Sequence, residues 1–184
     1  MTRSVPVLGS LQLRIELRDV VPRVWRRLVV PDGITMADLA EILLLAMGWD
    51  NVHLHIFEVG DESYGAADED AEEDEIDESS VIVSDVLGER DQFDFVYDLG
   101  DGWEHDVVIE ERSTSPVEFA LCIGGENACP PEDVGGPGGY EEFLETIADP
   151  AHAEHDEYLE WVGGSFDPGV FDVDGVNEKL RRLA

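Results

Sequence analysis

The sequence predicts a single α+β domain over residues 1–184, with antiparallel strands packed against helices in its first two-thirds and a helical C-terminal third. Apolar and polar residues alternate in several short segments of the first two-thirds, as they do in half-buried strands. Helix signals dominate the last third. Strands followed by helices are typical of the α+β class. An acidic insertion at residues 61–78 interrupts the region of strands.

The first two strands are predicted from strict alternation and from a turn. Residues 11–18, LQLRIELR, place four apolar side chains on one face: Leu11, Leu13, Ile15 and Leu17. Residues 23–30 form the second strand, which ends at the turn signal Pro-Asp-Gly at 31–33.

A helix is predicted over residues 36–47. Thr35 has the position and chemistry of an N-cap, and Asp38 three residues later would complete a capping box. Gly48 follows the last turn, where a helix commonly ends. We therefore expect both ends of this helix to be set by local sequence.

Residues 52–59 alternate again and predict a third strand, with His53 and His55 on the same face. Residues 61–78 then hold eleven carboxylates and no Lys or Arg. Such a charge run is typical of a solvated, disordered loop inserted in the domain.

The remaining elements follow from turn and cap signals. Strands are predicted at residues 93–98, 103–111 and 117–123, a Gly- and Pro-rich loop at 124–139, and helices at 140–148, 151–162 and 173–183. Asp101-Gly102 is a hairpin signal between the first two of these strands. Asp172 has the position of an N-cap for the last helix.

The charge of the chain is strongly negative. Asp and Glu number 44 and Lys and Arg number 11, for a formal net charge of −33. Such a chain repels itself at low ionic strength, so we expect a salt-adapted cytoplasm. No segment approaches the ~20 apolar residues of a membrane span, and the first ten residues lack the apolar core of a secretory signal. A cytoplasmic location without membrane contact is therefore expected.

A metal site is one hypothesis for the chemistry. His53 and His55 lie two residues apart on a predicted strand, and His105 lies beside the turn that carries Asp98 and Asp101. Imidazole and carboxylate groups together suit Zn, Mn or Fe in a hydrolytic site. The alternative is that both strand histidines are half buried and satisfied by hydrogen bonds.

Other polar and aromatic residues are weaker candidates. The four tryptophans, Trp25, Trp49, Trp103 and Trp161, would line a pocket or, as we favour, pack in the core. Arg26 and Arg27 would clamp an anion or form ion pairs. Glu132 and Asp133 are possible ligand residues, because the two prolines before them would stiffen the backbone that presents their carboxylates. The Gly-rich stretch that ends at Tyr140 lacks nucleotide-binding motifs and is interpreted as a structural turn.

Five segments together resemble the plasmid pRiA4b ORF-3-like family. They are VPRVWRRLVVP at 21–31, AMGWDNVHLHIF at 46–57, YDLGDGWEH at 97–105, CPPEDVGGPGGY at 129–140 and FDPGVFDVDGVNEKL at 166–180. The resemblance spans nearly the whole chain and implies an α+β fold and an association with plasmids and insertion sequences. It implies no established activity. Many members carry a cysteine at the position of Val134, so Cys122 and Cys129 would form an incomplete cysteine cluster here.

Three functions remain open from the sequence. We favour a non-catalytic accessory or binding module that works through contacts with a protein partner, because no complete catalytic motif is present. The second is a metal-dependent hydrolytic enzyme that uses the histidines and aspartates. The third is direct DNA binding through Arg14, Arg23, Arg26 and Arg27, which the net charge disfavours.

The net charge generates a prediction about salt. We expect the melting temperature to rise from dilute buffer to about 1 M KCl, where the Debye length is only ~3 Å and repulsion between the carboxylates is screened. Thermal unfolding followed by circular dichroism across a KCl series measures this. Equal stability in dilute buffer and in molar KCl contradicts salt adaptation.

Overall fold

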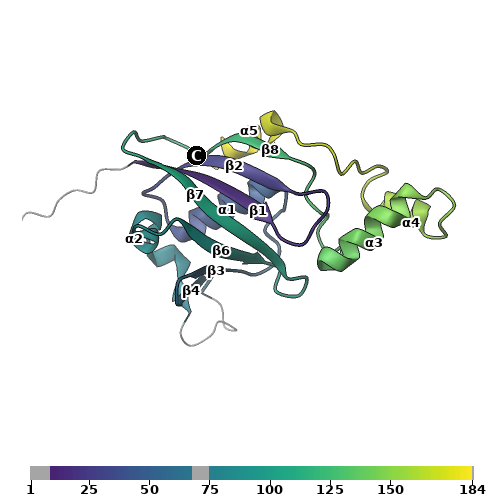
Figure 1. The fold of residues 1–184 in the computed structure, drawn as a ribbon, viewed down its shortest axis with the longest axis horizontal. Coiled ribbons are helices and arrows are strands. Elements are labelled where there is room, and N and C mark those ends of the chain that lie inside the picture. The colour runs from purple at the N-terminus through teal and green to yellow at the C-terminus, as the bar shows by residue number, and fades with distance from the viewer. Residues whose placement is uncertain (1–8, 68–74, 184) are drawn as a thin grey trace, which may run out of the picture.

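The computed structural model describes residues 9–67 and 75–183, and within them eight strands form one sheet (Figure 1). The strand order is β5-β4-β3-β6-β7-β1-β2-β8. All neighbours are antiparallel except β4 and β5, which are parallel. The strands are β1 Ser10–Leu17, β2 Trp25–Pro31, β3 His55–Val59, β4 Glu62–Gly65, β5 Ile76–Asp77, β6 Gln92–Tyr97, β7 Trp103–Ser113 and β8 Leu121–Glu126.

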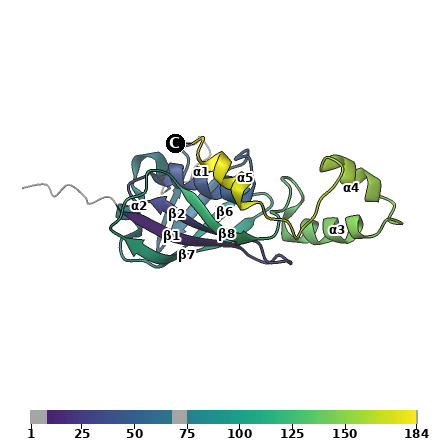
Figure 2. The same ribbon diagram turned by 90° about the horizontal axis from the view of Figure 1, so that it is seen from above.

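The helices lie in two places. They are α1 Met36–Met47, the short 3-10 turn η1 Glu78–Ser80, α2 Val83–Leu87, α3 Gly136–Ala148, α4 His155–Trp161 and α5 Val173–Leu180. Helices α1 and α5 cover one face of the sheet, and α3 with α4 stands to one side of it as an arm formed by residues 136–161 (Figure 2). Within the described residues, no helix has the length and apolar character that a bilayer span requires.

The middle of the sheet follows the predicted alternation. In β1, Leu11, Leu13, Ile15 and Leu17 are buried, while the residues between them are only partly buried. Burial of one such side chain contributes roughly 2 kcal/mol. The predicted hairpin is confirmed as β6 and β7, whose turn contains Gly102 at a φ of 69°.

The ends of α1 are set as the sequence predicts. The Thr35 side chain accepts a hydrogen bond from the Asp38 amide, and the Asp38 carboxylate accepts one from the Thr35 amide. Gly48 follows the helix at a φ of 129° and donates its amide to the carbonyl of Leu44. The predicted helix over residues 36–47 is confirmed.

The acidic insertion differs from the prediction. Residues 62–65 form β4 on the edge of β3, and residues 76–77 form β5, so a loop is wrong for these residues. Backbone pairing with β3 does not depend on side-chain charge, and Tyr64 adds a buried aromatic ring. Residues 68–74 of the predicted loop lie outside the described residues.

A buried arginine joins α1 to the sheet. Arg26 is 2% exposed, and its guanidinium donates five hydrogen bonds, all of them to backbone carbonyls. Two acceptors belong to the end of α1, and the others are the carbonyls of Trp25, Glu126 and Asn127. The Phe171 ring lies 4.0 Å from the guanidinium carbon. Arg26 is therefore neither an anion clamp nor one half of an ion pair, although the sequence suggested both roles.

Removal of this guanidinium should destabilise the fold. We expect Arg26→Lys and Arg26→Met each to lower the free energy of unfolding by about 3 kcal/mol or more, because neither side chain can donate hydrogen bonds to all five backbone carbonyls. Arg27→Lys on the same strand is the matched control, since its surface pair with Glu110 contributes less than about 1 kcal/mol. Urea denaturation of the three variants measures the difference. Equal losses for Arg26→Lys and Arg27→Lys contradict the structural role of Arg26.

Candidate metal centre

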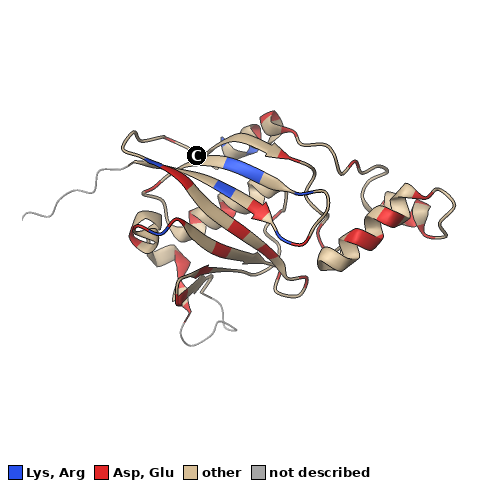
Figure 3. Cartoon of the chain, viewed as in Figure 1, with Lys and Arg blue, Asp and Glu red and all other residues tan. Residues whose placement is uncertain are grey.

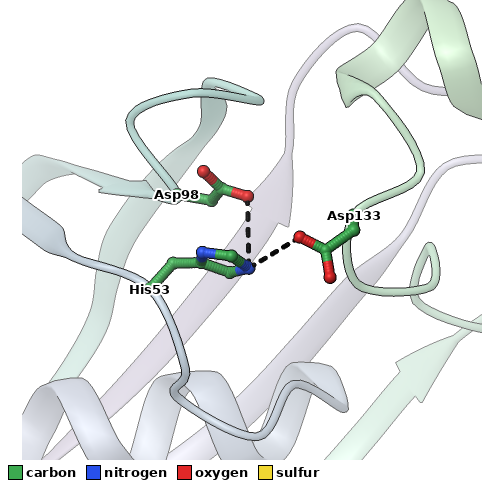
Figure 4. A group of neighbouring side chains, drawn as sticks. All are labelled: His53, Asp98 and Asp133. Carbon is green, nitrogen blue, oxygen red and sulfur yellow. Dashed lines mark ion pairs between the residues drawn. The ribbon is translucent and has the colours of Figure 1, made fainter.

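Three loops bring one histidine and two aspartates together beside the end of β6 (Figure 4). His53 precedes β3, Asp98 follows β6, and Asp133 lies between β8 and α3. The Nε2 atom of His53 is 3.0 Å from Oδ1 of Asp133 and 3.6 Å from Oδ2 of Asp98. One donor atom from each residue lies within 4.8 Å of the others. This spacing suits three ligands of a single cation.

Asp98 is oriented by its own turn. Its Oδ1 accepts hydrogen bonds from the amides of Gly100 at 3.0 Å and Asp101 at 3.2 Å. Its amide donates to the carbonyl of Leu54 at 2.9 Å, which ties the turn to the His53 loop. The residue is 8% exposed. Because Oδ1 is occupied by the turn, Oδ2 is the oxygen that faces His53.

A polar bridge ties the His53 loop to the Asp133 loop. The Tyr97 hydroxyl accepts a hydrogen bond from the Val52 amide at 3.1 Å and donates to Glu132 at 3.0 Å. Glu132 also accepts from the Asp50 amide at 2.9 Å. Desolvation, with a smaller effect from Glu132, raises the pKa of Tyr97. The neutral Tyr97 hydroxyl thus bridges the two loops, and Glu132 supports the site without facing His53.

The backbone at this site is unusual in three places. Asn51, Asp98 and Asp133 have φ values of 55°, 51° and 57°, which is the left-handed region. A residue other than glycine pays about 1 kcal/mol for this conformation, with Asn and Asp the most tolerant. Conformations of this kind cluster at functional sites, where surrounding contacts hold them in place.

The Nε2 atom of His53 is shielded from solvent but has no well-aligned hydrogen bond, although two carboxylates lie close to it. A buried polar atom of this kind requires an explanation. Imidazole nitrogen with two carboxylate oxygens fits Zn, Mn or Fe. Three protein ligands leave a coordination position open, as in catalytic sites. Asp133 lies on the open side, because its side chain is 70% exposed.

The structure does not bring together the three histidines of the metal hypothesis. His55 is buried, and its Nε2 lies 3.0 Å from Glu78. His105 is buried in the core, where its Nδ1 lies 3.0 Å from the Phe95 carbonyl. The predicted strand begins only at His55, so His53 and His55 do not follow one strand face.

Asp101 also stays outside the cluster, because its Oδ2 accepts a hydrogen bond from the Gly135 amide at 3.0 Å. It supports the turn before α3 instead. A side chain added at Gly136 would meet the Asp101 carbonyl at 2.4 Å, so the close approach requires glycine. The Gly-rich stretch therefore has a structural role, but its residues 136–140 form the first turn of α3, so a turn is wrong for them.

The remaining candidates are mostly structural. Trp49 and Trp103 are buried in the core as favoured, and Trp49 donates to the Pro130 carbonyl. Trp25 lies outside the core and donates to Glu126. Burial raises the pKa of the Cys129 thiol, and both cysteines are free thiols. Tyr140 packs on Phe143, and burial raises its pKa to about 12.

The arginines proposed for DNA binding are all engaged within the chain. Arg14 and Arg23 pair with Glu16, Arg27 pairs with Glu110, and Arg26 is buried. Figure 3 shows that acidic residues surround the few basic ones on the sheet. This arrangement offers little positive charge to a phosphate backbone.

The buried His105 generates a prediction about pH. Burial is the largest influence on the pKa of His105, which it lowers from 6.5 to about 4. The unfolded chain takes up the proton first as pH falls below 6.5, so this group should destabilise the fold by about 2 kcal/mol between pH 7 and pH 5. Urea denaturation at both pH values should show this loss in the wild type and in His152→Ala, but not in His105→Gln. The same pH dependence in all three proteins contradicts the prediction.

Comparisons with known proteins place this chain in a family. Residues 9–175 match the family model described as plasmid pRiA4b ORF-3-like protein. The chain is 40% identical over 182 residues to the uncharacterized protein y4hQ of Sinorhizobium fredii, with 97% of this chain and 94% of that protein covered. The crystal structure of MM3350, a protein of unknown function from Methanosarcina mazei Go1, superposes with a TM-score of 0.81 at 32% identity and covers 91% of this chain and 97% of that chain. The chain belongs to the plasmid pRiA4b ORF-3-like family.

Proposed function

We propose that this protein binds a divalent cation through His53, Asp98 and Asp133 and uses it in metal-dependent hydrolysis. The observation that carries the proposal is the solvent-shielded Nε2 of His53, which faces two carboxylate oxygens without a well-aligned hydrogen bond. The bridge through Tyr97 and Glu132 holds the loops in place before a cation arrives. Preorganised ligands of this kind favour binding.

An open coordination position supports the hydrolytic part of the proposal. A cation with three protein ligands can hold a water molecule and lower its pKa, which supplies a nucleophile near neutral pH. The exposed Asp133 side chain leaves room for a substrate on that side. The two carboxylates balance the charge of a divalent ion, and the imidazole selects for a transition metal over Mg²⁺ or Ca²⁺.

A second candidate is an accessory module of plasmids or insertion sequences that works through protein contacts in a salt-adapted cytoplasm. The arm of α3 and α4 favours it, because this arm stands beside the sheet and carries Trp161 with 47% of its surface exposed (Figure 1). Exposed tryptophan is enriched where proteins meet. This role does not require catalysis.

Metal binding is tested by loading the chelator-treated protein with Zn²⁺ or Mn²⁺ and measuring stoichiometry by elemental analysis. We expect one bound ion per chain in the wild type and in His152→Ala. His53→Ala, Asp98→Asn and Asp133→Asn should each lose it, because each removes one of three ligands. At 100 times the Kd, a ligand stabilises the fold by about 2.7 kcal/mol, so the melting temperature should rise only in the proteins that bind.

The same proteins separate the two candidates. Turnover of phosphate or carboxylate esters by the loaded wild type, absent in Asp133→Asn, supports a hydrolase. One bound ion without turnover favours the accessory module. Equal metal occupancy in the wild type and in all three ligand variants contradicts the metal centre itself.

A further inference from the structure

A cleft of about 330 Å³ lies between the Asp133 loop and α4. It is lined by Asp133, Val134, Glu154, Glu157, Tyr158 and Trp161. The cleft joins the body of the domain to the arm, and Asp133 borders it beside the candidate metal centre. A group bound here would therefore contact both parts of the molecule.

One wall of the cleft is aromatic and supported from behind. The Trp161 ring packs edge-on against Phe143 at 6.0 Å and against Tyr158 at 6.3 Å. Phe143 is fully buried and also contacts Tyr158 and Phe166. This support holds the indole in place while 47% of Trp161 stays exposed. A rigid aromatic surface of this kind recognises ligands at low entropic cost.

The rim of the cleft carries negative charge that the chain does not neutralise. Glu154, the N-cap residue of α4, and Glu157 on α4 are both exposed, and no Lys or Arg occurs between Arg112 and Lys179. Among the described residues, neither carboxylate has an ion-pair partner. On the sheet, by contrast, Glu16 and Glu110 are paired with arginines. The cleft thus combines an aromatic face with carboxylates that lack a cation.

We propose that this cleft binds an arginine side chain of a partner protein. A guanidinium is planar and weakly hydrated, so it can stack on Trp161 while it donates hydrogen bonds to Glu154 and Glu157. The chain already uses the same contact internally, because Arg26 lies over Phe171 and both Arg14 and Arg27 lie over Trp25. Anionic partners would be repelled by the carboxylates. This proposal rests on the accessory-module function, for which it names the partner group, and it does not require a cation at His53.

Isothermal titration of the full chain with acetyl-Gly-Arg-Gly-amide tests the proposal, and the same peptide with neutral citrulline is its control. Titrations use the lowest KCl concentration at which circular dichroism shows native protein. We expect the arginine peptide to bind roughly tenfold more tightly than the citrulline peptide, because a stacked, charge-paired guanidinium exceeds one exposed ion pair. Equal affinity for the two peptides overturns the proposal.

Two sets of variants locate the binding. Glu154→Gln with Glu157→Gln, and separately Trp161→Ala, should each weaken arginine binding roughly tenfold, whereas Trp161→Phe should keep most of it. Glu142→Gln with Glu160→Gln removes the same charge from exposed positions of the arm outside the cleft and should leave binding unchanged. An equal loss in this control pair assigns the effect to the general acidic field and overturns the site.

A chelator separates this inference from the metal centre. Arginine binding that persists in chelator-treated protein and in His53→Ala belongs to the cleft, whatever the outcome for the cation. Binding that disappears with the chelator places the peptide at the metal centre and overturns the proposal.

Discussion

The enclosure of one guanidinium governs how the sheet, α1 and the site fit together. Arg26 is removed from water, and burial lowers its pKa from the ordinary value, so its charge must be balanced by protein dipoles. The carbonyls of Ala46 and Met47 at the end of α1 supply part of this balance, and cations are favoured at that end of a helix. Gly125 leaves the necessary space, since a side chain there would lie 2.6 Å from Phe171 and 2.9 Å from Arg26.

The candidate metal centre is connected to this enclosure through the chain that leaves α1. Gly48 ends the helix, and Trp49 then donates to the Pro130 carbonyl. Glu132 lies two residues after Pro130 on the Asp133 loop. Its carboxylate accepts hydrogen bonds from the Asp50 amide and from the Tyr97 hydroxyl. Asp133 follows directly. The arrangement explains how an exposed aspartate on a loop is held near His53: its neighbours are anchored to the end of a buried helix and to a strand.

Charge is distributed unevenly over the molecule: some carboxylates are paired with arginines within the chain, and others have no such partner among the described residues. On the outer face of the sheet, Arg18 contacts three carboxylates and Arg27 contacts Glu110, so these charges are largely satisfied within the chain. The arm has acids and an exposed tryptophan but no Lys or Arg in its own sequence. Its recognition chemistry is therefore suited to cations. The candidate metal centre and the cleft beside it both present carboxylates, and Asp133 borders both.

Local patterns in the sequence determined the strands β1, β6 and β7, the capping box of α1, the hairpin at Gly102 and the acidic character of the surface, because each depends on neighbouring residues and backbone geometry. The sequence also identified His53, Asp98 and Asp133 as candidate site residues. Only the tertiary structure decided that Asp133 joins His53 while His105 enters the core and Asp101 supports a turn. It also decided that residues 62–65 pair with β3 and that Arg26 is enclosed by carbonyls. These outcomes depend on contacts between segments such as Asp50 and Glu132, 82 positions apart, and no periodicity along the chain encodes which distant loops will meet.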